Sequence, residues 1–236
     1  MQPSLRNVSI KGMKPSITSS FVAPSATVAG NVQIGGNSAV WYGAILRGQG
    51  HALTIGESSS VGDLSVISSL SANTHIGSNV SIGTGVSITD SVVGDNTVLG
   101  DGVKLLRNSK VESQAMVASG SVVATGTVVP TGQVWGGSPA SYLRDLSSSE
   151  LHALQHTHCE TLQLSVLHAS EAAKSWEAIE REEFDYENVV DRNSEYYQQL
   201  SNEELSKSLG EVEGHMVPGR IFDSPGGLRV CMGVYC

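Results

Sequence analysis

The chain has 236 residues, a net charge of −9 and three cysteines. This length suits one domain with an extension, and the acidic balance argues against a nucleic-acid-binding protein, which needs a basic face. No run approaches the roughly 18 apolar residues of a membrane-spanning helix, so the sequence predicts none. Cys159, Cys231 and Cys236 are too scattered for a disulfide framework or a Cys-x-x-Cys motif. This favours a reducing compartment, although Cys231 and Cys236 can pair in an oxidising one.

Residues 1–20 are basic, rich in serine and free of acidic residues. This composition is typical of an organelle transit segment. Pro3 and Pro15 interrupt any long amphipathic helix, so the same residues also suit an N-terminal arm or a first irregular strand. Both interpretations remain open.

From Val22 to Val134 an aliphatic residue returns every six positions, with few interruptions. Residues six apart lie on the same face of a β-strand but drift around a helix, so the pattern predicts short strands with one buried face. Glycine often follows the aliphatic residue, as at Gly35, Gly56 and Gly77. Such glycines indicate corners that need a positive φ or a close approach of two backbone segments.

A six-residue repeat with a corner after each strand predicts a parallel β-helix over residues 21–144. With three hexapeptides per coil there are about six coils, in a prism about 30 Å long. The alternative is a β-sandwich, which lacks a strict period. Two nine-residue steps, 46–55 and 67–76, predict loops that protrude at corners, and the five-residue step 88–93 predicts a one-residue deletion.

After residue 144 the pattern becomes helical, and 145–190 is expected to be a helical region. Ser147 and Glu150 match a capping box. A helix is then expected to about residue 173, packed on the prism or on a neighbour through the apolar stripe Leu151, Leu154, Leu162, Val166 and Ala169. A second, acidic helix is expected from about residue 175 to 190, followed by an extended acidic tail over 191–236. This acidic end suits either a basic partner or a solvated surface.

The segment Trp41-Tyr-Gly-Ala-Ile-Leu-Arg-Gly-Gln49 resembles the γ-class carbonic anhydrases. The resemblance continues through the hexapeptides to the exit segment 134–140. Residues 168–180 resemble the C-terminal region of the γ-carbonic-anhydrase subunits of mitochondrial respiratory complex I in plants, algae and protists. The resemblance covers about residues 21–200. It implies a left-handed β-helix, a trimer and a zinc site between subunits.

In that family three histidines bind the zinc, and the resemblance places their positions at Ser68, Thr84 and Thr89. Serine and threonine hydroxyls are poor zinc ligands, because they are neutral and stay protonated near pH 7. The family's supporting glutamine and aspartate are replaced by Gly62 and Gln49. Without a metal-bound water, CO₂ hydration loses its nucleophile. We therefore expect no zinc, no other cofactor and no catalytic residue on this chain.

Two functional positions of the family are retained, at Arg47 and Asp63. In the family, the matching residues hold the site and the trimer interface. A partly buried arginine–carboxylate pair between chains would position subunits without a metal. The alternative is that each residue pairs within its own chain, and we favour the interface.

The histidines offer weaker candidate sites. His51 and His75 lie in the two expected loops and can approach each other over one corner, but two histidines make an incomplete tetrahedral site. His152, His156 and His158 lie on the first helix without a His-Glu-x-x-His motif, so we expect them on the helix surface.

Acyl transfer is the alternative chemistry, because hexapeptide acyltransferases share this prism and use one histidine as a general base. His75 is the candidate base. A nucleotide-like carrier would need a basic cluster near this loop, but Lys104, Arg107 and Lys110 lie about two coils away.

Three hypotheses follow from the resemblance. The first is a non-catalytic subunit of mitochondrial complex I, in a trimer on the matrix side of the inner membrane, that contacts membrane-arm subunits and serves assembly. The second is a mixed trimer that retains zinc only at the interface between two partner subunits. The third is a binding module whose emptied intersubunit groove holds a small molecule or an acyl group.

Overall fold

The computed structural model describes residues 6–18 and 21–191. A left-handed parallel β-helix of about seven turns is followed by helix α1, Ser148–Ala172. The chain divides into two compact units after Trp176, and the described part of the second is most of helix α2, Trp176–Asp191. The predicted fold class is confirmed.

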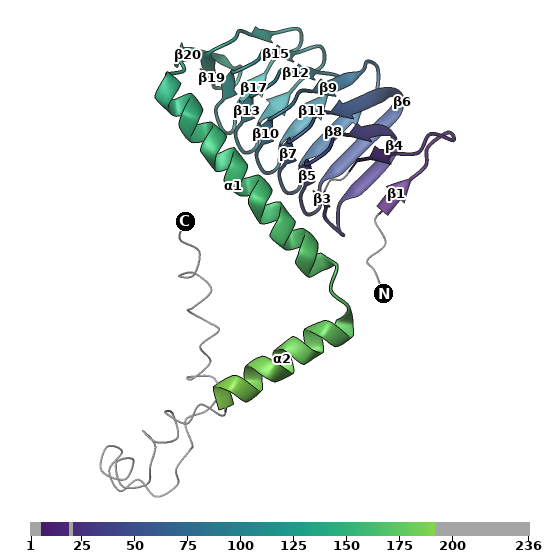
Figure 1. Cartoon of the computed structure of the whole chain (residues 1–236). Helices are drawn as coiled ribbons and strands as arrows, with labels where there is room; N and C mark the ends of the chain where they lie inside the picture. The colour runs from purple at the N-terminus through teal and green to yellow at the C-terminus, as the bar shows by residue number, and fades with distance from the viewer. Residues whose placement is uncertain (1–5, 19–20, 192–236) are drawn as a thin grey trace, which may run out of the picture. The chain divides into compact units, whose positions relative to one another are not determined.

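The β-helix has three faces (Figure 1). Faces 1 and 2 are the two halves of one 12-stranded sheet, joined through β4, Thr27–Ile34, and β6, Ile45–Ile55. Residues 45–48 of β6 pair with β8 on face 1, and residues 53–55 pair with β9 on face 2. Face 3 is an eight-stranded sheet.

The strands are short, mostly two to four residues. Face 1 continues with β8 (Val66–Ser69), β11 (Ser87–Thr89), β14 (Lys104–Leu105) and β17 (Val122–Val123). Face 2 continues with β9 (Thr74–Ile76), β12 (Val92–Val93), β15 (Lys110–Val111) and β18 (Val128–Val129). Face 3 comprises β3 (Phe21–Val22), β5 (Ala39–Val40), β7 (Ser60–Val61), β10 (Ser81–Ile82), β13 (Val98–Leu99), β16 (Met116–Val117), β19 (Gln133–Gly136) and β20 (Ser141–Asp145).

Face 3 shows the number of layers directly. Seven parallel strands, β3 to β19, stack one per turn, and the antiparallel β20 closes the end. The length of the repeat at three hexapeptides per coil predicts about six coils, which corresponds to six intervals between layers. The six intervals that lead from Val22 to Trp135 separate seven layers.

The aliphatic series forms the core, as predicted. From Val28 to Val129 every member of the series is at most 3% exposed. Burial of one such side chain stabilises a fold by about 1.5–3 kcal/mol. The repeat is therefore the main source of stability of the prism.

The glycines that follow these aliphatic residues are required for close approach and do not have a positive φ. A Cβ on Gly56 would lie 2.6 Å from the carbonyl carbon of Gly77 in the next turn. The left-handed positions fall two residues later, at Asn37, Ser58, Asn79 and Asn96.

The two nine-residue steps differ. The first lies inside the continuous strand β6, whose register with β4 shifts between Gly30 and Val32, so the prediction of a loop is wrong there. The second forms a loop, 70–73, between β8 and β9. The two insertions stack, because the Ala52 N–H donates to Asn73 Oδ1 at 3.0 Å.

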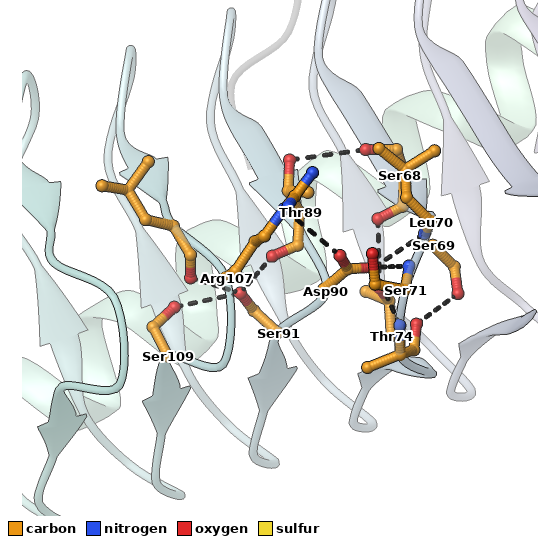
Figure 2. A network of polar contacts seen from close by, with 12 residues as sticks. Ser68, Ser69, Leu70, Ser71, Thr74, Thr89, Asp90, Ser91, Arg107 and Ser109 are labelled. Atoms are coloured by element: carbon orange, nitrogen blue, oxygen red, sulfur yellow. Dashed lines mark hydrogen bonds and ion pairs between the residues drawn. The ribbon is translucent and has the colours of Figure 1, made fainter.

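The five-residue step places Asp90 beneath that loop (Figure 2). Asp90 is 3% exposed, and its Oδ1 accepts hydrogen bonds from the N–H groups of Leu70 (2.6 Å), Ser71 (3.0 Å) and Ala72 (3.3 Å). Its Oδ2 lies 3.6 Å from Nε of Arg107. Burial raises the pKa of Asp90, but the three N–H donors and the Arg107 charge together outweigh it, so the pKa lies below its ordinary value.

Part of the expected N-terminal arm belongs to the prism. Strands β1, Arg6–Val8, and β2, Ser16–Ile17, pair in parallel with the two halves of β4. They extend faces 1 and 2 by one layer, in agreement with the irregular first strand that the sequence allows. A targeting role for residues 1–20 stays a prediction.

Helix α1 begins at the predicted capping box. The Ser147 hydroxyl accepts the Glu150 N–H, and the Glu150 carboxylate accepts the Ser147 N–H. Arg144 donates two hydrogen bonds to the same carboxylate, at 2.7 and 2.8 Å. The hydrogen bonds from Arg144 and then Ser147 lower the pKa of Glu150 to about 2.

Helix α1 lies along face 3 (Figure 1). Leu162 is buried and packs with Trp41, as the predicted stripe requires. Val166 is 62% exposed, so it does not pack on the prism, and its packing on a neighbour stays a prediction. The buried stripe instead includes two polar residues, His158 and Ser165.

The second predicted helix is confirmed as α2. None of the helices in the described ranges is long and apolar enough to cross a membrane. The expected tail after residue 191, with Cys231 and Cys236, lies outside the described residues.

The corner glycines generate the first prediction. Gly56→Ala is expected to lower the free energy of unfolding by about 1–3 kcal/mol, because the new Cβ meets backbone that cannot move aside. Gly36→Ala is the matched control, since its Cβ would lie 3.8 Å from the nearest atom. Urea denaturation measures both, and equal midpoints would contradict the close-approach requirement.

The Asp90 network generates the second prediction. Because the folded-state pKa lies below the unfolded value, the ionised carboxylate stabilises the fold above the unfolded pKa, and this contribution is lost as pH falls through the folded pKa. Asp90→Asn is expected to cost about 1–3 kcal/mol at pH 7. The deficit should shrink as pH falls below about 4.

Thermal melts from pH 7 to pH 3 measure this difference. Asp95→Asn is the control, because Asp95 is exposed and its carboxylate accepts one backbone N–H, that of Ser78. A deficit for Asp90→Asn that stays constant with pH would show that the charge of Asp90 contributes nothing.

Candidate functional site

The three positions that correspond to the family's metal ligands lie on two parts of the prism. Arg47, Ser68 and Thr89 are in register on β6, β8 and β11 of face 1. Ser68 Oγ lies 3.4 Å from Thr89 Oγ1 (Figure 2). Thr84 lies at the corner after β10, where its N–H and hydroxyl both donate to Asp101 Oδ1, at 2.8 and 3.1 Å.

These donors do not fit zinc. All three side chains are neutral hydroxyls, and each has a hydrogen-bond partner within the chain. Protein zinc sites use Cys, His and carboxylate ligands. Across the ranges that the structure describes, no three His, Cys, Asp or Glu side chains gather at a metal-binding distance.

Asp63 has a role within its own chain. Its Oδ1 accepts the Tyr42 N–H at 2.8 Å, one turn below. Asp95 and Asp101 make the same bond, to the N–H groups of Ser78 and Thr84, at 2.8 Å each. Asp63 is therefore one of a series of aspartates that cap corners of the preceding turn.

Arg47 is exposed on the outer side of face 1, beside Ser68. Its place on an open sheet face suits contact with another subunit. The interface role of Arg47 and Asp63 stays a prediction, since no partner chain is present.

The two histidines of the insertions are not directly opposite each other. His75 on β9 pairs with Thr54 of β6, which is three positions after His51. On face 2, His75 is followed in register by Val92 and then Lys110, so this cation lies two strands away, as predicted. Lys110 is paired with Glu112 at 3.2 Å.

Of the three helix histidines, His152 and His156 are exposed, as expected. The prediction for His158 is wrong, because it is 8% exposed and its Nε2 donates to the Ser58 carbonyl at 2.7 Å. His158 lies four residues from both Leu154 and Leu162, so the helical spacing of the leucines is the signal that indicates its burial.

An aromatic cluster, which sequence reasoning missed, holds the far end of α1. His168 Nδ1 lies 3.0 Å from Tyr42 Oη, and the His168 ring packs edge-on to Trp41 with centroids 5.2 Å apart. Phe21 also contacts this cluster. The Trp41-Tyr42 pair, which contributes to the family resemblance, is thus a docking site for the helix on the first turns.

Comparison with known proteins finds relatives among the mitochondrial gamma carbonic anhydrases. The chain is 37% identical over 169 residues to gamma carbonic anhydrase 2, mitochondrial, of Arabidopsis thaliana, which is 69% of this chain and 61% of that relative. A segment of 39 residues, 16% of this chain and 14% of the relative, is 49% identical to gamma carbonic anhydrase 1, mitochondrial, of the same plant. The chain is therefore homologous to mitochondrial gamma carbonic anhydrases. It spans only about three fifths of the length of the first relative.

Solved structures show the same architecture. The N-acyltransferase AntD of Bacillus cereus, 11% identical, matches with a TM-score of 0.53 over 63% of this chain and 91% of its own, which shows the fold alone. No family model matches the chain. A hexapeptide transferase family protein from Anaplasma phagocytophilum is 32% identical, with a TM-score of 0.65 over 67% of this chain and 95% of its own. By this identity and coverage, the chain belongs to the hexapeptide transferase family.

Proposed function

We propose that this chain is a non-catalytic γ-carbonic-anhydrase-like subunit of mitochondrial complex I, with a structural role in a trimer on the matrix side of the membrane arm. The mitochondrial relatives support the compartment. The resemblance of residues 168–180 to complex I subunits supports the assembly.

The observation that carries the proposal is the chemistry at the three ligand positions. Ser68, Thr84 and Thr89 offer neutral hydroxyls where the family offers imidazoles, and Thr84 is held by Asp101. The surrounding prism is intact, because the inward aliphatic residues remain buried along its length. The protein therefore retains the scaffold without a donor set for zinc.

Restoration of the ligands tests this proposal. The purified chain is expected to hold fewer than about 0.1 zinc ions per subunit and to lack CO₂ hydration above the buffer rate. The triple variant Ser68→His/Thr84→His/Thr89→His is expected to gain about one zinc per subunit in a homotrimer. Elemental analysis and stopped-flow CO₂ hydration measure both properties.

The double variant Ser68→His/Thr89→His is the control, because it lacks the third ligand. Stoichiometric zinc held by the unmodified chain would overturn the proposal. Acetyl-CoA turnover that is lost in His75→Ala would instead support the acyltransferase alternative. Migration of the native chain apart from complex I in blue-native gels would contradict the assembly role.

In a trimer with mixed subunits, zinc is expected only between two partners that retain histidines. Each interface needs ligands from both sides, so one copy of this chain removes the two sites that it touches.

Arg47 tests the trimer separately. Arg47→Gln is expected to lower the association constant of the trimer by at least about tenfold, because a carboxylate on the neighbouring subunit loses its partner. The fraction of trimer at micromolar protein concentration should fall accordingly. Light scattering after size-exclusion chromatography measures the mass. Lys110→Gln removes an equal charge from face 2 and is the control. Equal masses for both variants would place Arg47 outside the interface.

A further inference from the structure

A groove of about 350 Å³ lies between α1 and the corner between faces 2 and 3, where the His158–Ser58 hydrogen bond joins the two elements. On the helix side its wall is apolar and includes Leu151, Leu154 and Leu162. On the prism side, left-handed corner residues of successive turns form the floor, among them Asn79 and Asn96. The groove is thus amphipathic across its width.

The groove is long and narrow. From Leu151 to Leu162 the helix advances about 16 Å. From Asn37 to Asn96 the corners climb three turns, or about 14 Å at the spacing of paired strands. A volume of about 350 Å³ is at the lower end of the range for small-molecule pockets, and spread over this length it suits a slender ligand such as a single alkyl chain.

The lining carries no Asp, Glu, Lys or Arg. A charged ligand would lose its hydration there without gaining an opposite charge. Amide and hydroxyl groups of the corner residues offer both donors and acceptors to a neutral polar group.

His158 adds a polar feature in the middle of the groove. Its Nε2 carries the proton that the Ser58 carbonyl accepts, so in the neutral ring Nδ1 is an acceptor. This buried Nδ1 has no hydrogen-bond partner in the described part of the chain.

We propose that this groove binds a single alkyl chain with an uncharged hydroxyl or amide headgroup, of the monoacylglycerol class. The alkyl chain lies along the leucines of α1, where each buried methylene favours binding. The headgroup bonds to the corner amides. The groove lies away from Ser68 and Thr89 on face 1, so this site is independent of the proposed complex I role.

Calorimetry with the full-length, delipidated chain tests the site. The probe is 1-decanoylglycerol below its micellar concentration, and decanoate is the charged ligand with an equal chain. We expect one molecule of 1-decanoylglycerol per chain and at least about tenfold weaker binding of decanoate. Absence of binding up to the micellar concentration of the probe, or equal binding of decanoate, would overturn the proposal.

Variants locate the binding. Leu154→Trp fills the groove from the helix and Ser81→Leu fills it from the prism, and each is expected to weaken binding by at least about tenfold. Ala153→Trp, on the exposed side of α1, should bind as the unmodified chain does. Circular dichroism and thermal melting verify that the variants fold. Unchanged binding in both filling variants would overturn the assignment.

Cys159 reports a competing occupant, because it is exposed and lines the groove. A photo-crosslinker is attached to it in a Cys231→Ser/Cys236→Ser background. Cross-links to 1-decanoylglycerol support the proposal. Cross-links to residues 192–236 or to a second copy, unaffected by the probe, would show that protein fills the groove and would overturn it.

Discussion

The structure depends on hydrogen bonds between the backbones of successive turns. This pairing fixes one spacing for the whole prism, so whatever occupies a position in one turn must tolerate its equivalent in the next. Aliphatic side chains inside and glycines at the tightest corners satisfy this condition. Extra residues in a turn either continue a paired strand, as in β6, or form a loop that the next turn supports, as loop 70–73 rests on Asp90.

The same condition gives several polar residues of the candidate site a structural role. A corner leaves backbone N–H groups that need an acceptor from the next turn, and the carboxylates of Asp63, Asp95 and Asp101 provide it. Asp63 thus has a structural role within its own chain, and its role at a subunit interface stays a prediction. Ser68 and Thr89 belong to a row of short polar side chains that fits the stacking, whereas their family counterparts serve chemistry.

Much of the fold could be predicted from the sequence because it is a local, repeated pattern. The period of six identified the core from Val28 to Val129, and Ser147 with Glu150 identified the start of α1. The course of β6 through its insertion could not be predicted, because strand pairing on both sides overrides the local irregularity. At the candidate site, no local pattern marks Ser68, Thr84 and Thr89. Only the family resemblance indicates that they occupy metal-ligand positions.

The errors on α1 have a different origin. The spacing of apolar residues alone includes Val166, which is exposed on the isolated chain, and omits His158, which is buried. A histidine with a backbone carbonyl in reach can occupy a packed face, and that carbonyl belongs to Ser58, 100 residues away. The aromatic contact of His168 with Tyr42 likewise joins residues 126 positions apart, a separation that no local pattern encodes.

Helix α1 has a consequence for the cooperativity of the whole unit. A solenoid in which each turn contacts only its neighbours behaves as a one-dimensional array that can fray from either end. Here the helix leaves the last layer at Ser147 and returns to the first layers, where His168 meets Trp41 and Tyr42. The two ends of the array are thereby mechanically coupled. Unfolding of the last turn would release helix α1 from the first turns, so we expect the prism to unfold cooperatively and not coil by coil.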